Sequence, residues 1–92
     1  MAKNRFEQVD EIEPDAITLS LWREGEETFG NVSCPAAIAG GRLAADEVSE
    51  RAPIKEAFRQ AVRLANEIKA PIVVVDPDAL WMPEWGDLVR ES

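Results

Sequence analysis

The sequence predicts an α+β fold, or a small α/β fold, in which one long helix packs on a sheet of three or four strands. Three patterns indicate it: an alternating segment and turn near the N-terminus, an amphipathic stretch of four helical turns, and a β-branched run directly after it. The 92 residues fit one thin core, which a dimer partner would help to stabilise. We expect a single globular domain over residues 16–92, after a charged N-terminal segment over residues 1–15.

The N-terminal segment 1–15 is rich in charge and poor in apolar side chains. Phe6, Val9 and Ile12 are three residues apart, which is compatible with one weak helical stripe. The alternative is a flexible segment that ends at Pro14. The sequence leaves both interpretations open.

A β-hairpin is predicted next. Apolar and polar side chains alternate from Ile17 to Arg23, the period-2 pattern of a strand with one buried face. Residues 24–27 indicate a turn, in which Gly25 adopts a positive φ at low cost. A shorter second strand follows around Phe29 and Val32.

The middle of the chain is ambiguous. Residues 33–41 are mostly small and are compatible with a third strand or with a helical turn that begins at Pro35. Residues 42–51 are compatible with a short helix or a long loop.

The clearest predicted element is a helix from Pro53 to about Lys69. Pro53 suits the first helical position, and Pro71 forces the helix to end. The apolar side chains follow the i, i+3, i+4 pattern at Ile54, Ala57, Phe58, Ala61, Val62, Ala65 and Ile68.

The segment 72–76 predicts the central strand, because its four consecutive β-branched residues favour burial on both faces. Asp76 would then cap a helical turn that begins at Pro77, and Pro83 would keep it short. We therefore expect short helical turns at the C-terminus.

Charge excludes some classes of partner. The chain has 10 Lys and Arg against 18 Asp and Glu, for a net charge of −8. We expect no nucleic-acid binding, which needs clustered basic residues, and no membrane partner, since no apolar run is long enough to span a bilayer. With one cysteine and no apolar signal segment in residues 1–15, we expect a cytoplasmic location.

The composition of this chain excludes most common arrangements of catalytic residues. It has no histidine and one cysteine, so Ser-His-Asp triads, Cys-His pairs and zinc frameworks are absent. Its glycines form no phosphate-binding loop. We therefore expect no catalytic residues, metal or cofactor, and lean towards a protein that is not an enzyme.

Two groups of residues keep an alternative open. Cys34 would be reactive if Pro35 began a helix there, but a small buried residue is the commoner explanation. Asp76 and Asp78, with Glu84 and Asp87 nearby, would suit a divalent cation, but a cap among solvated surface carboxylates is the commoner explanation. The alternative function is a small-ligand- or metal-binding protein, or an enzyme, whose site is completed across a dimer.

The best functional signal is a C-terminal apolar group made of Trp81, Met82, Trp85 and Leu88. Tryptophan and methionine are enriched at protein interfaces, although these residues would also serve as core. Trp22 is a further candidate for the same surface. The leading hypothesis is a small acidic interaction or regulatory module that binds another protein or self-associates as a homodimer.

Overall fold

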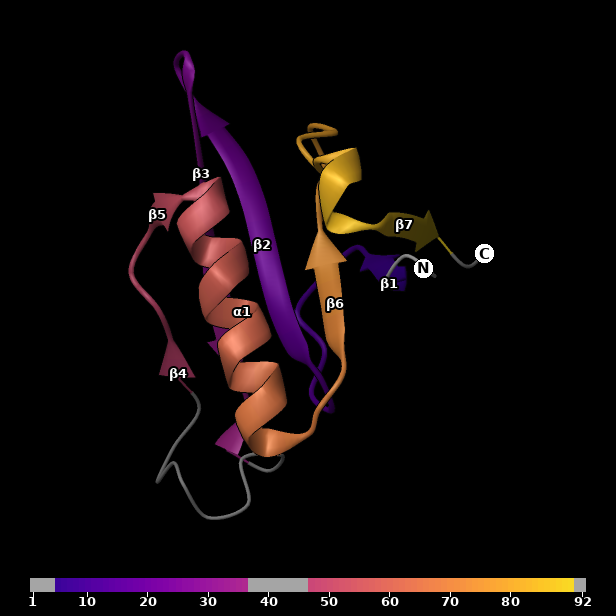
Figure 1. Ribbon diagram of the computed structural model, residues 1–92. Coiled ribbons are helices and arrows are strands. Elements are labelled where there is room, and N and C mark those ends of the chain that lie inside the picture. Colours follow the sequence, from indigo (N-terminus) through magenta and orange to yellow (C-terminus); the bar gives the residue numbers. More distant parts are fainter. Residues whose placement is uncertain (1–4, 37–46, 91–92) are drawn as a thin grey trace.

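The computed structural model describes residues 5–36 and 47–90, and confirms the α+β class (Figure 1). One helix packs on a mixed sheet of seven strands. The elements in chain order are β1 (Arg5–Val9), β2 (Ile17–Glu24), β3 (Glu27–Cys34), β4 (Glu47–Val48), β5 (Ala52–Pro53), α1 (Ile54–Ile68), β6 (Ile72–Val75), a 3₁₀ helix (Pro83–Trp85) and β7 (Asp87–Arg90).

The strand order across the sheet is β4-β3-β2-β6-β1-β7, and β5 also pairs with β3. The run at residues 72–75 forms β6, which lies between β2 and β1 and runs parallel to both. The predicted central strand is therefore confirmed. The sheet is larger than three or four strands because β1 and β7 extend it on one side and two strands of two residues join on the other.

Strand β1 corrects the helical interpretation of the N-terminal segment. Phe6 is 9% exposed and lies in the core, whereas Ile12 is 54% exposed and lies outside it, so the three-residue spacing is not a buried stripe. The segment is held in the sheet by the pairing of its backbone with β6 and β7, and not by the burial of an apolar helical face. The boundary between an N-terminal segment, residues 1–15, and a globular domain, residues 16–92, stays a prediction.

The predicted hairpin is formed by β2 and β3, which are antiparallel. Gly25 has a φ of 65° at the turn between them, as expected. Gly30 faces the helix: a Cβ there would lie 3.0 Å from the Cβ of Ala57 and 2.9 Å from the carbonyl oxygen of Ser20. This absence of a side chain lets α1 approach the sheet closely.

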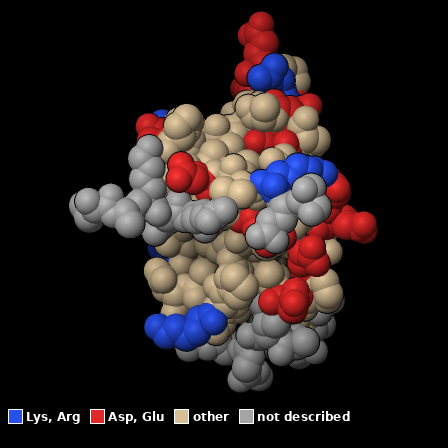
Figure 2. Space-filling model, turned by 90° about the vertical axis from the view of Figure 1, so that its right-hand side faces the viewer, with Lys and Arg blue, Asp and Glu red and all other residues tan. Residues whose placement is uncertain are grey.

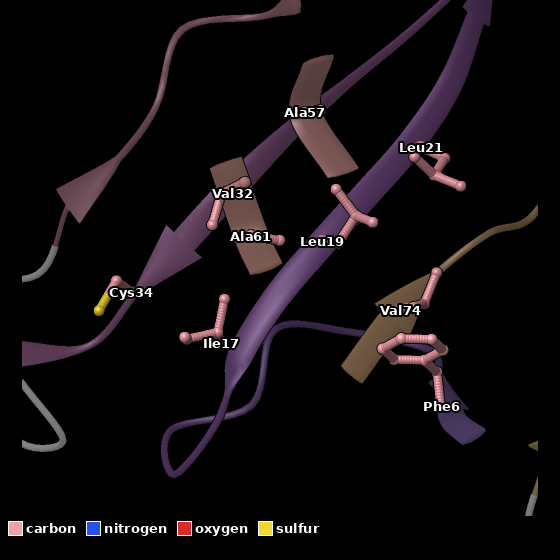
Figure 3. Close-up of a cluster of buried hydrophobic side chains, with 9 residues drawn as sticks. All are labelled: Phe6, Ile17, Leu19, Leu21, Val32, Cys34, Ala57, Ala61 and Val74. Carbon is pink, nitrogen blue, oxygen red and sulfur yellow. The ribbon is translucent and has the colours of Figure 1, made fainter. Parts of the chain in front are cut away.

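Helix α1 covers one face of the sheet: in Figure 1 it lies in front of β3 and along β2, and it also contacts β6. Ala57 and Ala61 are fully buried against the sheet. Pro53 is the N-cap, one residue before the helical position expected for it, and Lys69 ends the helix in the left-handed conformation. Figure 3 shows the core between helix and sheet, where Ile17, Leu19 and Leu21 of β2 meet Val74 of β6.

The face of the sheet turned away from α1, called here the far face, is partly covered by the connection from β1 to β2. Glu13 N donates to Thr18 Oγ1 over 3.1 Å, and Thr18 lies on the far face because its neighbours Ile17 and Leu19 face the helix. Thr18 and Val73 are buried beneath this connection. Further along, far-face side chains such as Trp22 and Val75 stay half-buried.

Strand β3 also settles part of the ambiguous middle. It continues through Cys34, so residues 33 and 34 form a strand rather than a helix start. Glu47–Val48 is a strand as well, which excludes a helix at that end of the segment 42–51. Residues 37–46 lie outside the described part of the chain. Among the residues described, no helix combines the length and apolarity needed to cross a bilayer.

Candidate functional site

Four rings from three parts of the chain form the aromatic cluster: Phe6 of β1, Phe58 of α1, Trp81 and Trp85. Phe58 and Trp85 stack at 4.5 Å between centroids with 5° between planes. Trp81 meets Phe6 and Trp85 edge-on, at 5.1 and 5.0 Å. Its indole Nε1 also donates to the Gly86 carbonyl over 3.0 Å.

This cluster places the C-terminal apolar group against the core. Trp81, Trp85 and Leu88 pack on the buried residues while staying half-buried themselves, and Met82 is half-buried beside them. The rings therefore serve as core on one side and keep some exposed surface on the other. Because contacts on several sides fix these side chains, little conformational entropy remains for a partner to remove from them.

Asp76 is the polar centre of this region, and it is 4% exposed. Its Oδ1 accepts the backbone N–H of Leu80 and its Oδ2 accepts that of Trp81, both over 2.8 Å. The helix cap predicted at Asp76 is wrong, because no helix begins at Pro77: residues 77 and 78 form a turn, and Ala79 has a φ of 56°. The carboxylate holds amides four and five residues ahead, which organises a loop and places Trp81.

The proposed cation ligands are not brought together. Both oxygens of Asp76 accept backbone amides, while Asp78, Glu84 and Asp87 are exposed. Within residues 5–36 and 47–90, no group of three His, Cys, Asp or Glu side chains could hold a metal ion.

Cys34 is the last residue of β3 and is 3% exposed. Its Sγ donates to the Pro35 carbonyl over 3.8 Å. It lines a hollow of about 570 Å³ with Gln60 and Leu64 of α1. The interpretation of Cys34 as a small buried core residue is confirmed.

The C-terminal apolar group lies beside the outer strand β7, which the sequence did not predict. An open groove of about 580 Å³ runs there, lined by Trp81, Pro83, Gly86, Asp87, Leu88 and Val89. In register, Leu88 is paired with Phe6, so it faces α1, while Val89 is paired with Glu7 and points to the far face. Apolar side chains of the outer strand therefore border both faces of this edge.

The two edges of the sheet differ in protection. On the β3 side, the strands β4 and β5 have only two residues each, and β5 contains Pro53. Ser49 also pairs with the backbone of Val32. The Val32 N–H donates to Ser49 Oγ and the Ser49 N–H donates to the Val32 carbonyl, each over 2.9 Å. On the other side, β7 pairs with β1 alone among the described residues. Its sequence Asp-Leu-Val-Arg contains no proline, and its two charged residues stand at its two ends, with Leu88 and Val89 between them.

A second set of contacts lies on the hairpin, away from the aromatic cluster. Trp22 Nε1 donates to Glu24 Oε2 over 2.8 Å, and Arg51 donates to Glu24 Oε1 over 2.7 Å. The Arg51 guanidinium also lies 4.9 Å from the centre of the Phe29 ring. The bonds from Trp22 and then Arg51 lower the pKa of Glu24. Trp22 is thus held on the far face of the hairpin and does not extend the C-terminal apolar group. No sequence pattern pointed to the Arg51 contacts.

No protein-family model, curated protein or solved structure matches this chain. A proposal about its function therefore depends on the geometry of its own residues. Among the residues described, the feature that stands out is the outer edge of β7, which pairs with no further strand and lies beside half-buried, firmly held aromatic side chains.

Proposed function

We propose that this chain is a small protein-binding module that receives its partner along β7. The main support is the contrast between the two sheet edges in the part of the chain that the structure describes. One edge is closed by short strands, Pro53 and Ser49, and the other ends at β7, whose outer side pairs with no strand. A row of unpaired backbone N–H and C=O groups is a template for an added strand. The main-chain hydrogen bonds of that strand would supply affinity.

The apolar residues beside β7 would supply the side-chain contacts. Trp81 and Leu88 line the groove, and Met82, which follows Trp81 in the chain, is half-buried. Trp85 stacks on Phe58 and so supports Trp81 from behind. A few firmly held aromatic and aliphatic side chains commonly dominate the affinity of an interface.

Two further parts of the proposal concern the location of the protein and the alternative function. We propose a cytoplasmic location, and the single cysteine, a buried core residue that suits a reducing compartment, supports it. The alternative of a ligand site or an enzyme is weaker, because the Asp76 oxygens are engaged by backbone amides and Cys34 is buried.

The experiment compares two valines in outer strands. Val89→Lys places a charge on β7, whereas Val48→Lys places the same charge on β4, where Val48 is already 60% exposed. Tagged wild type and both variants are used for affinity capture from the source cells with quantitative mass spectrometry, after thermal unfolding has shown that each variant folds.

We expect a stoichiometric partner that is retained by Val48→Lys and reduced by about tenfold or more in Val89→Lys, because a lysine on an edge disfavours strand addition. Equal recovery by all three proteins would contradict the proposal. So would the absence of any stoichiometric partner of the wild type.

A further inference from the structure

We propose that the partner is an extended segment in which basic side chains alternate with apolar ones, and that it lies against β7 with its basic side chains on the far face. This inference rests on the proposed function and names the chemistry of the partner. It depends on the different character of the two faces beside β7. Along an added strand, successive side chains point to opposite faces, so each face selects every second residue.

On the helix face, the groove selects apolar residues. A strand added to β7 would lie about 4.8 Å from it, in reach of its side chains. Leu88 faces this side, and Trp81 lines the same groove. Both are half-buried, so an apolar side chain placed against them would remove their remaining exposed surface from water.

On the far face, the surface selects positive charge. Asp87 and Val89 of β7 point there, and the exposed Glu7 is next to Val89 on β1. Beyond Glu7, a hollow of about 440 Å³ is lined by two more carboxylates, those of Glu13 and Asp15. A lysine opposite Val89 would extend over this valine towards Glu7.

The basic residues near this edge are few. Arg5 is the register partner of Asp87, and Arg90 is already paired with Asp10. Figure 2, which looks at the side of the molecule that carries β7, shows acidic side chains gathered along its right-hand part with few basic ones among them. The net charge of −8 acts in the same direction.

A second copy of this chain is a poorer occupant. Two copies would each bring a charge of −8. Antiparallel pairing of two β7 strands around a twofold axis turns the far faces of both copies to the same side, so that Asp87 and Glu7 of each would lie on one surface. The charge pattern therefore favours a basic partner over self-association.

The test uses a synthetic eight-residue peptide of alternating Lys and Val, blocked at both ends, added to the full chain. The matched control peptide has Glu in place of every Lys. Binding is followed by the NMR shifts of the backbone amides of β7 and of the Trp81 indole N–H. We expect these signals to move with the lysine peptide, and the glutamate peptide to bind about tenfold more weakly, since two or three exposed ion pairs together account for such a factor.

Variants of one residue separate charge from strand addition. Val89→Glu should tighten binding of the lysine peptide and Val89→Lys should weaken it, each by about two- to fivefold, while Val48→Lys leaves it unchanged. Raising the salt concentration should weaken binding in all of them.

Three outcomes would overturn the inference. If both peptides bind β7 equally, the result supports strand addition but contradicts the proposed preference of this edge for basic side chains. If the lysine peptide moves no β7 signal at millimolar concentration, the proposed chemistry of the partner falls, and the proposed function is judged separately by the capture experiment. If the β7 signals move with protein concentration in the absence of peptide, the occupant is a second copy.

Discussion

Asp76 links the end of the central strand to the side chains of the candidate site. Its carboxylate is buried, and both of its oxygens accept backbone amides of the following loop. Gln8 of β1 adds a bond from its Nε2 to the Asp76 carbonyl over 3.1 Å. The Asp76 side chain thus fixes the loop that carries Trp81, and the Gln8 side chain ties the start of that loop to the neighbouring strand.

Replacing Asp76 tests this role. Asp76→Ala leaves the amides of Leu80 and Trp81 without their acceptor, and we expect the free energy of unfolding to fall by about 2–4 kcal/mol. Asp76→Asn keeps one carbonyl oxygen and should lose less. Urea unfolding at neutral pH measures both, with Asp78→Ala as the exposed control that should change by less than about 0.5 kcal/mol. Equal stability of Asp76→Ala and Asp78→Ala would exclude the role.

Glu24 gives a prediction about pH. The Trp22 and Arg51 bonds lower the pKa of Glu24 in the folded protein. This contribution to stability is present above the unfolded-state pKa of Glu24 and disappears as pH falls through the lower, folded-state pKa. Trp22→Phe removes the first of these donors, so the pKa of Glu24 should rise towards its ordinary value. Carbon-13 NMR titration of the carboxyl group measures it, with Arg59→Gln on α1 as a control that should leave it unchanged.

At the scale of elements, the helix and the strands beneath it could be predicted because their own side chains show the pattern. The alternation in β2, the helical spacing in α1 and the β-branched run in β6 each show which side chains of that element are buried, without knowledge of its neighbours. Strands β1 and β7 show no such pattern. In β7, the neighbouring residues Leu88 and Val89 are both half-buried on opposite faces, and the strand exists because β1 lies beside it.

Packing of α1 on the hairpin depends on Gly30. In Gly30→Ala, the new Cβ would meet the Ser20 carbonyl oxygen at 2.9 Å and the Ala57 Cβ at 3.0 Å, so we expect a loss of about 1–3 kcal/mol in the free energy of unfolding. Because Ala57 is one of the three close contacts, the others being Ser20 and Leu21, adding Ala57→Gly should recover part of this loss.

The matched control is Gly25→Ala at the hairpin turn. Its Cβ would meet nothing within 4 Å, and its cost comes from the φ of 65°. Double-mutant cycles by denaturant unfolding compare the change in the free energy of unfolding of each double mutant with the sum for its two single mutants. Gly30→Ala and Ala57→Gly should depart from this sum, whereas Gly25→Ala and Ala57→Gly should match it. Coupling of equal size in the two cycles would contradict this account of the packing.

At the scale of the whole molecule, the candidate site arises where three distant parts of the chain meet. Trp81 and Trp85 were identifiable from the sequence as an apolar group, and they lie on a loop and a 3₁₀ turn. Phe6 and Phe58 could not be assigned to the same cluster, since only the tertiary fold brings β1 and α1 to these tryptophans. The unprotected edge was out of reach for the same reason, because it requires the strand order.

The central claim is that a protein partner adds along β7, and backbone hydrogen exchange of the complex tests it most directly. With the captured partner bound, we expect slower exchange at alternate residues of β7, those whose N–H groups point away from β1, and unchanged exchange at β4 and β5. Unchanged exchange throughout β7, with protection appearing instead on the hairpin or on α1, would contradict the claim.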